Sequence, residues 1–102
     1  MLPVKKHRLV DADFQSACEW YEAKQPGLGS EFIEDFQRAY QRLRKYPLFY
    51  SVRFANVRRL NLERFPYGIF YVVRSEEIRV LAVLHSSRDS ENILARRRRA
   101  FP

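Results

Sequence analysis

Cysteine, glycine and proline are scarce in this chain of 102 residues, which has one cysteine, three glycines and five prolines. Because Cys18 has no second cysteine to pair with, an internal disulfide is excluded, and the chain suits a reducing compartment such as the cytosol. The low share of glycine and proline, with 46% apolar and 15% aromatic residues, is typical of a folded chain and excludes extensive disorder.

Long apolar runs are also missing. No stretch approaches the roughly 18 apolar residues that a membrane-spanning helix needs. Residues 1–10 are too polar for a secretory signal peptide. We therefore expect a cytoplasmic protein with no membrane partner, and the length suits one domain over residues 1–102.

Negative charge is sparse beyond the first third of the chain. Nineteen Lys and Arg stand against twelve Asp and Glu, a formal net charge of +7. Residues 1–37 carry four basic and seven acidic side chains, residues 38–64 carry eight and one, and residues 65–102 carry seven and four. Solubility alone does not require this asymmetry. The basic part is therefore predicted to meet a polyanion or an acidic protein.

The first half of the sequence predicts a helical hairpin. Asp11 is the expected N-cap of a first helix that ends at Gln25-Pro26-Gly27, and Ser30 is the expected cap of a second helix that Pro47 ends. Apolar side chains spaced along one helix face support both helices. They are Phe14, Ala17, Cys18 and Tyr21 in the first helix, and Phe32, Phe36, Ala39, Tyr40, Leu43 and Tyr46 in the second.

The second half predicts strands, because β-branched and aromatic residues dominate it. The expected strands are 4–10, 57–63, 65–74 and 78–85. The first is a short edge strand, in which His7 is expected to be a surface residue. Residues 48–56 are expected to be a loop, and residues 92–99 either a short helix or a basic tail. The predicted fold class is α+β with the order β-α-α-β-β-β, in which a helical hairpin packs on a mostly antiparallel sheet.

Four stretches, in order along the chain, carry a family resemblance. They are Asp13-Phe14 with Trp20-Tyr21-Glu22; Pro26 to Gly29 with Phe32; Val57 to Leu60 with Arg64 to Tyr71; and Ile78 to His85 with Arg88-Asp89. Together they run from about residue 4 to residue 90. In this order and spacing the chain resembles the RelE/ParE toxins, which include the plasmid-stabilisation proteins.

The resemblance implies the toxin of a type II toxin–antitoxin system. It implies one RelE/ParE-like domain over residues 1–102, with a basic C-terminal segment at about 91–102. A cognate antitoxin would cover the working surface in a toxin–antitoxin hetero-oligomer. RelE-like members cut mRNA on the ribosome, and ParE-like members poison DNA gyrase. No metal and no cofactor is expected for either activity.

Metal-independent RNA cleavage needs a base, an acid and a cation around the scissile phosphate. The candidates are His85 as acid or base, Tyr67 or Tyr71 as proton partner, and Arg58, Arg59, Arg64 and Arg88 as cations. The nuclease members of the family that the chain resembles carry an arginine in the second strand of the central hairpin, where this chain has Gly68. We therefore expect no catalytic residues. The expected function is a ParE-like toxin that acts by binding its target, and the RelE-like endoribonuclease is the alternative.

A toxin that acts by binding would use the same side chains, together with Trp20 and the C-terminal arginines, to contact its target or its antitoxin. For Trp20, packing within the fold is the alternative. The expected contact residues are Trp20, Arg58, Arg59, Arg64, Tyr67, His85, Arg88, Arg96, Arg97, Arg98 and Arg99. Arg58 and Arg59 are neighbours on a strand and should point to opposite faces. Structural alternatives stay open: ion pairs with helix acids for this arginine pair, solvation for Arg64, and a backbone contact for His85. A relative that keeps the fold without toxicity is a further alternative.

Overall fold

The structure is a computed structural model that describes residues 1–100, so the last two residues of the basic segment lie outside the described residues. In chain order the elements are β1 (Val4–Lys6), α1 (Val10–Lys24), α2 (Leu28–Lys45), β2 (Val52–Phe54), β3 (Val57–Asn61), β4 (Tyr67–Arg74), β5 (Glu77–His85) and α3 (Glu91–Ala100). The predicted α+β class is confirmed. The expected loop over 48–56 contains the short strand β2, and residues 92–99 belong to a helix.

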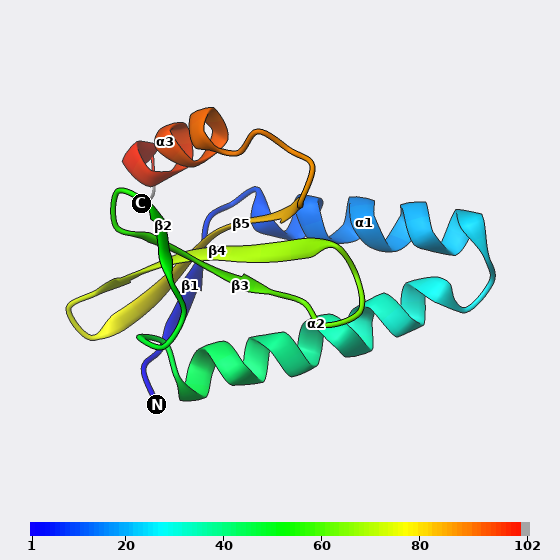
Figure 1. Cartoon of the computed structure of the whole chain (residues 1–102), viewed down its shortest axis with the longest axis horizontal. Coiled ribbons are helices and arrows are strands. Elements are labelled where there is room, and N and C mark those ends of the chain that lie inside the picture. Colours follow the sequence, from blue (N-terminus) through cyan, green and yellow to red (C-terminus); the bar gives the residue numbers. More distant parts are fainter. Residues whose placement is uncertain (101–102) are drawn as a thin grey trace.

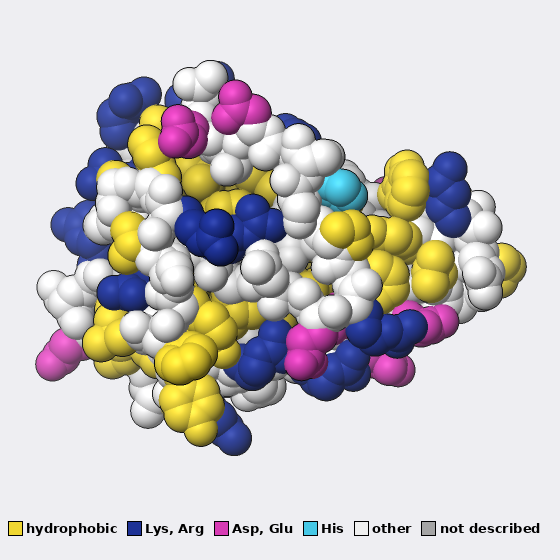
Figure 2. Space-filling model, viewed as in Figure 1, with side chains coloured by type: hydrophobic (Ala, Val, Ile, Leu, Met, Phe, Trp, Pro, Cys, Tyr) yellow, Lys and Arg dark blue, Asp and Glu magenta, His cyan; other side chains and the backbone are white. Residues whose placement is uncertain are grey.

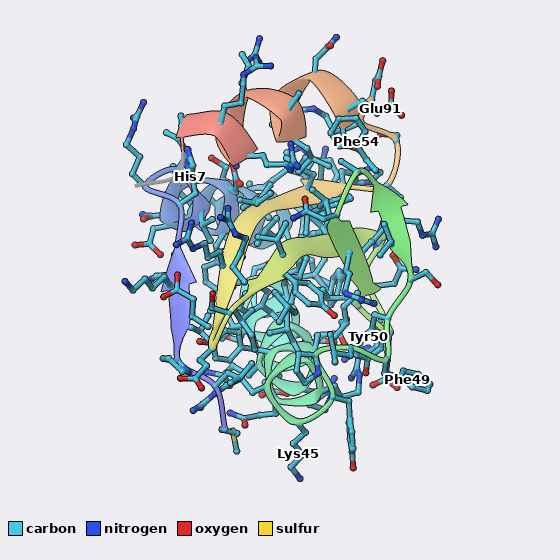
Figure 3. The ribbon with its side chains drawn as sticks, turned by 90° about the vertical axis from the view of Figure 1, so that its left-hand side faces the viewer. His7, Lys45, Phe49, Tyr50, Phe54 and Glu91 are labelled. Atoms are coloured by element: carbon cyan, nitrogen blue, oxygen red, sulfur yellow. The ribbon has the colours of Figure 1, made fainter. Side chains whose placement is uncertain are left out.

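The five strands form one sheet in the order β1-β5-β4-β3-β2. Strand β1 runs parallel to β5, and the other neighbours pair antiparallel, as the sequence predicts. The helices α1 and α2 form a hairpin, and α3 lies across the sheet from it (Figure 1). The end-on view of Figure 3 shows α3 and α2 on opposite sides of the strands.

Each face of the sheet has its own apolar core. Phe32 and Leu43 of the hairpin pack with Ile69 and Tyr71 on one face. On the other face Leu94 of α3 packs with buried side chains of three strands, which are Val57, Phe70, Val72, Leu81, Ala82 and Leu84. Strand β5 is therefore buried on both faces, which explains its nearly continuous run of apolar residues.

The start of α1 differs from the prediction because of His7. The helix begins at Val10 with Leu9 as its N-cap, and Asp11 lies in the first turn, where its carboxylate pairs with Lys6 at 2.7 Å. The His7 side chain is only 3% exposed, so its expected surface position is wrong. The Leu9 N–H donates to His7 Nδ1 at 3.1 Å, and this contact forms the turn that precedes the helix. Burial lowers the pKa of His7, and the charge of Arg97 adds to that shift.

The start of α2 is set by Gly27 and not by Ser30. Gly27 is the N-cap with a φ of 90°, a backbone conformation that glycine adopts without strain. The Glu22 carboxylate of α1 accepts hydrogen bonds from the N–H groups of Gly27 and Gly29, both at 3.0 Å. A side chain from the neighbouring helix thus satisfies the first N–H groups of α2. At the other end Tyr46 is the C-cap and is 60% exposed, so it does not close the apolar stripe.

The chain that leaves α2 is held against the sheet by two neighbouring side chains of β3 and β4. The Tyr71 hydroxyl donates to the Pro47 carbonyl at 2.6 Å. Arg58 Nη1 donates to the carbonyl of Tyr50 at 2.7 Å and to that of Leu48 at 3.2 Å. Burial raises the pKa of Tyr71 to about 12. Arg58 and Tyr71 therefore act as structural anchors of this loop.

Replacing Tyr71 by phenylalanine is expected to lower the free energy of unfolding by about 1 kcal/mol at pH 8, the usual loss for one buried hydrogen bond. The folded pKa lies above the value of about 10 in the unfolded chain. The contribution of this hydroxyl is thus complete below pH 10 and is lost as the pH rises toward 12. Urea denaturation at pH 8 and pH 11 should show a smaller loss with pH in Tyr71→Phe than in wild type. The exposed Tyr46→Phe is the control, and equal pH losses in wild type and Tyr71→Phe would contradict the assignment.

Candidate functional site

Two concave surfaces meet at Tyr67, the first residue of β4. The first, here named the Trp20 groove, has a volume of about 470 Å³ and lies between α1 and the end of β5. Its lining includes Trp20, Tyr67, His85, Ser87 and Arg88. The second, here named the Arg59 pocket, has a volume of about 410 Å³ and lies beside β3 and the β3–β4 loop. Its lining includes Arg53, Arg59, Asn61, Arg64, Tyr67 and Ser86.

The Trp20 groove has an exposed aromatic wall. Trp20 is 55% exposed although it is the largest side chain of the chain. Its ring contacts Tyr21 edge-on at 5.1 Å, and Lys24 Nζ lies 4.7 Å from the ring centroid. In Figure 2 a histidine is visible beside hydrophobic side chains over α1. A tryptophan held in one orientation at a groove is typical of a protein-contact site.

The end of β5 supplies the polar side of this groove. The rings of Tyr67 and His85 meet edge-on at 5.2 Å. His85 Nδ1 accepts the Ser87 N–H at 3.0 Å, so the neutral ring carries its proton on Nε2 and presents a donor. Burial raises the pKa of Tyr67, which the nearby Arg88 opposes, and the Tyr67 hydroxyl is protonated at neutral pH. The groove thus combines hydrogen-bond donors with aromatic surface.

The Arg59 pocket is organised around one restrained guanidinium. Arg59 Nε donates to Asn61 Oδ1 at 2.6 Å, and Nη2 donates to Ser86 Oγ at 2.9 Å. The guanidinium carbon lies 5.0 Å from the centroid of the Phe70 ring. Burial lowers the pKa of Arg59, and the charge of Arg53 adds to that shift. Arginine stays charged at neutral pH despite such shifts, so a fixed cation lies on the α3 side of the sheet.

Gly68 makes room for this cation. A Cβ at this position would lie 2.7 Å from Arg59 Nε and 3.0 Å from its guanidinium carbon. Arg59 therefore occupies the space above Gly68. The glycine that stands where the resemblance implies an arginine is covered by an arginine from the neighbouring strand β3.

The candidate residues of the hypothetical nuclease site do not gather in one place. Tyr67, His85 and Arg88 line the Trp20 groove. Arg58 donates to backbone carbonyls of the loop after α2, on the opposite face of the sheet from Arg59. Arg64 Nη2 pairs with Glu31 Oε1 at 2.6 Å. Arg59 and Arg64 line the Arg59 pocket, which shares only Tyr67 with the Trp20 groove, and the Tyr71 hydroxyl donates to the Pro47 carbonyl. The candidates are thus divided between different surfaces.

The arginines of the C-terminal segment have different environments on α3. Arg97 is directed inward and pairs with Asp13 of α1 at 2.6 Å. Arg98 Nε donates to Asn56 Oδ1 at 2.6 Å, which links α3 to the turn between β2 and β3. Arg96 and Arg99 are exposed. The segment is a docked helix, of which Arg97 is a structural part.

Three residues of the Arg59 pocket were not expected from the sequence. Arg53 lies on the strand that was not predicted, and Ser86 comes from the exit of β5. Asn61 lies two residues after Arg59 and so on the same face of β3. That alternation was the one available signal, since the place of Ser86 depends on the register between strands.

The sequence matches a family model over residues 4–90, and this model describes the ParE toxin of the type II toxin–antitoxin system parDE. The chain belongs to the ParE toxin family. Membership in a toxin–antitoxin family implies an antitoxin as partner of this ParE family toxin. The resemblance predicted from the sequence is thus confirmed for the family.

A solved structure supports the fold of this ParE toxin. The chromosomal ParDE TA system from P. aeruginosa is similar with a TM-score of 0.73 and 22% identity, over 83% of this chain and 96% of that chain. At this identity the likeness bears on the fold alone. No curated protein matches the sequence. Within residues 1–100, no helix is both long and apolar enough to cross a bilayer.

Proposed function

We propose that this ParE family chain is a growth-inhibiting toxin that binds DNA gyrase in the cytoplasm and is neutralised by a cognate antitoxin in a toxin–antitoxin hetero-oligomer. The proposal takes the whole chain as one toxin domain that needs no cofactor. The observation that carries it is the family match over residues 4–90. The dispersal of the nuclease candidates supports binding over catalysis, because Arg58 and Arg64 are engaged away from His85.

The Trp20 groove is the proposed protein-contact site. Trp20 and Tyr67 offer rigid aromatic surface, and such side chains carry much of the binding energy at protein interfaces. Arg88 lines the same groove, and no acidic side chain among residues 1–100 forms an ion pair with it. An acidic segment with an apolar anchor fits this combination.

RelE-like cleavage of mRNA is the second candidate function. The observation that favours it is the placement of Tyr67, His85 and Arg88 in one groove. Incubation with translating ribosomes tests this candidate directly. New RNA ends that disappear in His85→Ala and Arg88→Ala would establish cleavage, and unchanged RNA would exclude it.

Calorimetric titration of purified gyrase with the purified chain tests the proposed target, and expression of the chain alone tests toxicity. We expect saturable binding to gyrase and growth arrest, with rescue by the antitoxin. Absence of binding at saturating concentrations would reject gyrase as the target. Unimpaired growth would favour a relative that has lost toxicity.

Trp20→Ala is expected to weaken binding of gyrase or antitoxin by at least about tenfold, as for a tryptophan at the centre of an interface. Because this side chain is 55% exposed, the free energy of unfolding should change by less than about 0.5 kcal/mol. Affinity is measured by calorimetry and stability by urea denaturation. Tyr46→Ala, at an exposed aromatic residue outside the groove, serves as control. Equal affinity of wild type and Trp20→Ala for both partners would show that the groove is not part of the interface.

A further inference from the structure

We propose that the Arg59 pocket binds the phosphodiester backbone of nucleic acid. This goes beyond the proposed function, because it concerns a different face of the toxin and does not require gyrase. The Trp20 groove lies beside α1, whereas Arg59 packs on Phe70, a residue of the core under α3.

Two of the three cations that line the pocket, Arg53 and Arg59, have no acidic partner among residues 1–100. Arg53 and Arg59 are close enough for the charge of one to lower the pKa of the other. The acids near the pocket are already engaged: Glu63 pairs with Arg42 at 3.3 Å, and Glu31 pairs with Arg64 at 2.6 Å. Two unneutralised guanidinium groups side by side repel each other, and an anion between them would relieve the repulsion.

The guanidinium of Arg59 is oriented before any ligand arrives. Asn61 and Ser86 bind its Nε and Nη2, and the Phe70 ring supports it from below. Within residues 1–100 the Nη1 group of Arg59 makes no hydrogen bond, so its N–H groups are available to donate to a ligand. Because Gly68 has no Cβ, the guanidinium lies directly against the strand. A flat, fixed arginine of this kind suits recognition of an oxyanion.

The positive charge continues from the pocket toward α3. Residues 48–60 contain no acidic residue, and Arg53 and Arg59 of this segment line the pocket. Arg98 is attached to Asn56 in the turn next to β2, and Arg99 is exposed beyond it. Figure 2 shows dark-blue side chains in the hollow between α3 and the strands. A row of cations suits the successive phosphates of a nucleic acid better than a single carboxylate.

The lining of the pocket also favours nucleic acid over an acidic peptide. Peptide recognition relies on apolar anchors that enter exposed apolar pockets. Here Leu62 and Phe65 are buried in the core, with exposures of 6% and 8%, so the accessible apolar surface is limited to Pro66 and part of Tyr67. The one carboxylate in the lining, that of Glu63, already pairs with Arg42. The other accessible groups are guanidinium, amide and hydroxyl groups, which are the side chains that contact phosphates in protein–DNA complexes.

Fluorescence anisotropy with a labelled 20-base-pair duplex DNA and a single-stranded RNA of equal length tests the proposal in a salt series. We expect the intact chain to bind at least one of them, with an affinity that falls as salt rises. Arg59→Gln should weaken binding about tenfold and reduce the slope of log K against log salt by about 1, as for the loss of one phosphate contact. Gly68→Ala should weaken binding in the same direction, since the new Cβ displaces the guanidinium.

Arg74→Gln is the matched control, because it removes the same charge from an exposed residue at the other end of β4. Equal losses of nucleic-acid affinity in Arg59→Gln and Arg74→Gln would overturn the proposal, because they would show only the nonspecific attraction of a basic protein to a polyanion. Binding of poly-glutamate but of neither nucleic acid would also overturn it and assign the pocket to an acidic protein. If Arg59→Gln does not fold by circular dichroism, Arg53→Gln and Gly68→Ala decide the matter. Gyrase titration of the same variants is read separately, so failure of one proposal leaves the other standing.

Discussion

Asp35→Ala is expected to lower the free energy of unfolding by about 3 kcal/mol, in the range found when one partner of a buried charged network is removed. The Asp35 side chain is fully buried. Its Oδ2 accepts the N–H of Arg64 at 2.8 Å and the N–H of Phe65 at 3.1 Å, and Oδ1 accepts the N–H of Glu63 at 3.4 Å. Without the carboxylate these donors of the β3–β4 loop lose their acceptor.

Chemical denaturation of Asp35→Ala, Asp35→Asn and the exposed neighbour Glu34→Ala measures this effect. Asparagine keeps one acceptor oxygen, so Asp35→Asn should lie between the wild type and Asp35→Ala. A loss in Asp35→Ala no larger than in Glu34→Ala would show that the loop does not depend on this carboxylate. Because the loop lines the Arg59 pocket, Asp35→Ala should also weaken the binding of any ligand to that pocket.

Arg97→Ala should also cost about 3 kcal/mol of stability, because it leaves the Asp13 carboxylate without its cation in a site where both side chains are only 12% exposed. Arg97 donates through Nη1 and Nη2 to the two carboxylate oxygens of Asp13, at 2.6 Å and 3.1 Å. Nη1 also donates to the Leu81 carbonyl at 3.0 Å, and the Val83 N–H donates to Asp13 Oδ2 at 3.0 Å. One ion pair thus connects α3, α1 and β5.

Amide hydrogen exchange and urea denaturation test the Arg97 prediction together. We expect faster exchange along α3 in Arg97→Ala, and a smaller loss of stability in Asp13→Ala/Arg97→Ala than the sum of the single losses. Arg96→Ala, in the same arginine run but exposed, should leave both measurements unchanged. Exchange and stability that are equal in Arg97→Ala and Arg96→Ala would disprove the proposed docking of α3.

Local spacing and composition predicted most of the fold. The apolar spacing of Phe14, Ala17 and Tyr21 marks the helix face that meets the sheet, and the nearly continuous apolar run at the end of β5 fits a strand that is covered on both faces. The predicted helix starts were wrong because side chains other than the predicted caps bind the backbone N–H groups there. His7 binds the turn before α1, and Glu22 reaches across to α2. Strand β2 has only three residues, too few to show an alternating pattern.

The candidate site was harder to predict, because it depends on strand register. The resemblance places Gly68 where the nuclease members of the family carry an arginine. It does not show that Arg59 fills the vacated space from β3, since this requires the pairing of Asn61 with Gly68. The residues that were expected to form one site lie on different surfaces for the same reason. Alternation placed Arg58 and Arg59 on opposite faces, and only the folded chain shows which partners each one meets.

Inhibition of gyrase supercoiling tests the proposed action of this ParE family toxin most directly. The purified chain is titrated into gyrase with relaxed plasmid and ATP, and Trp20→Ala is titrated in parallel. We predict loss of supercoiling with accumulation of cleaved plasmid, at toxin concentrations that scale with the gyrase concentration, and a weaker effect of the variant. Normal supercoiling at saturating toxin, together with new mRNA ends on translating ribosomes, would contradict the proposal and establish the endonuclease instead.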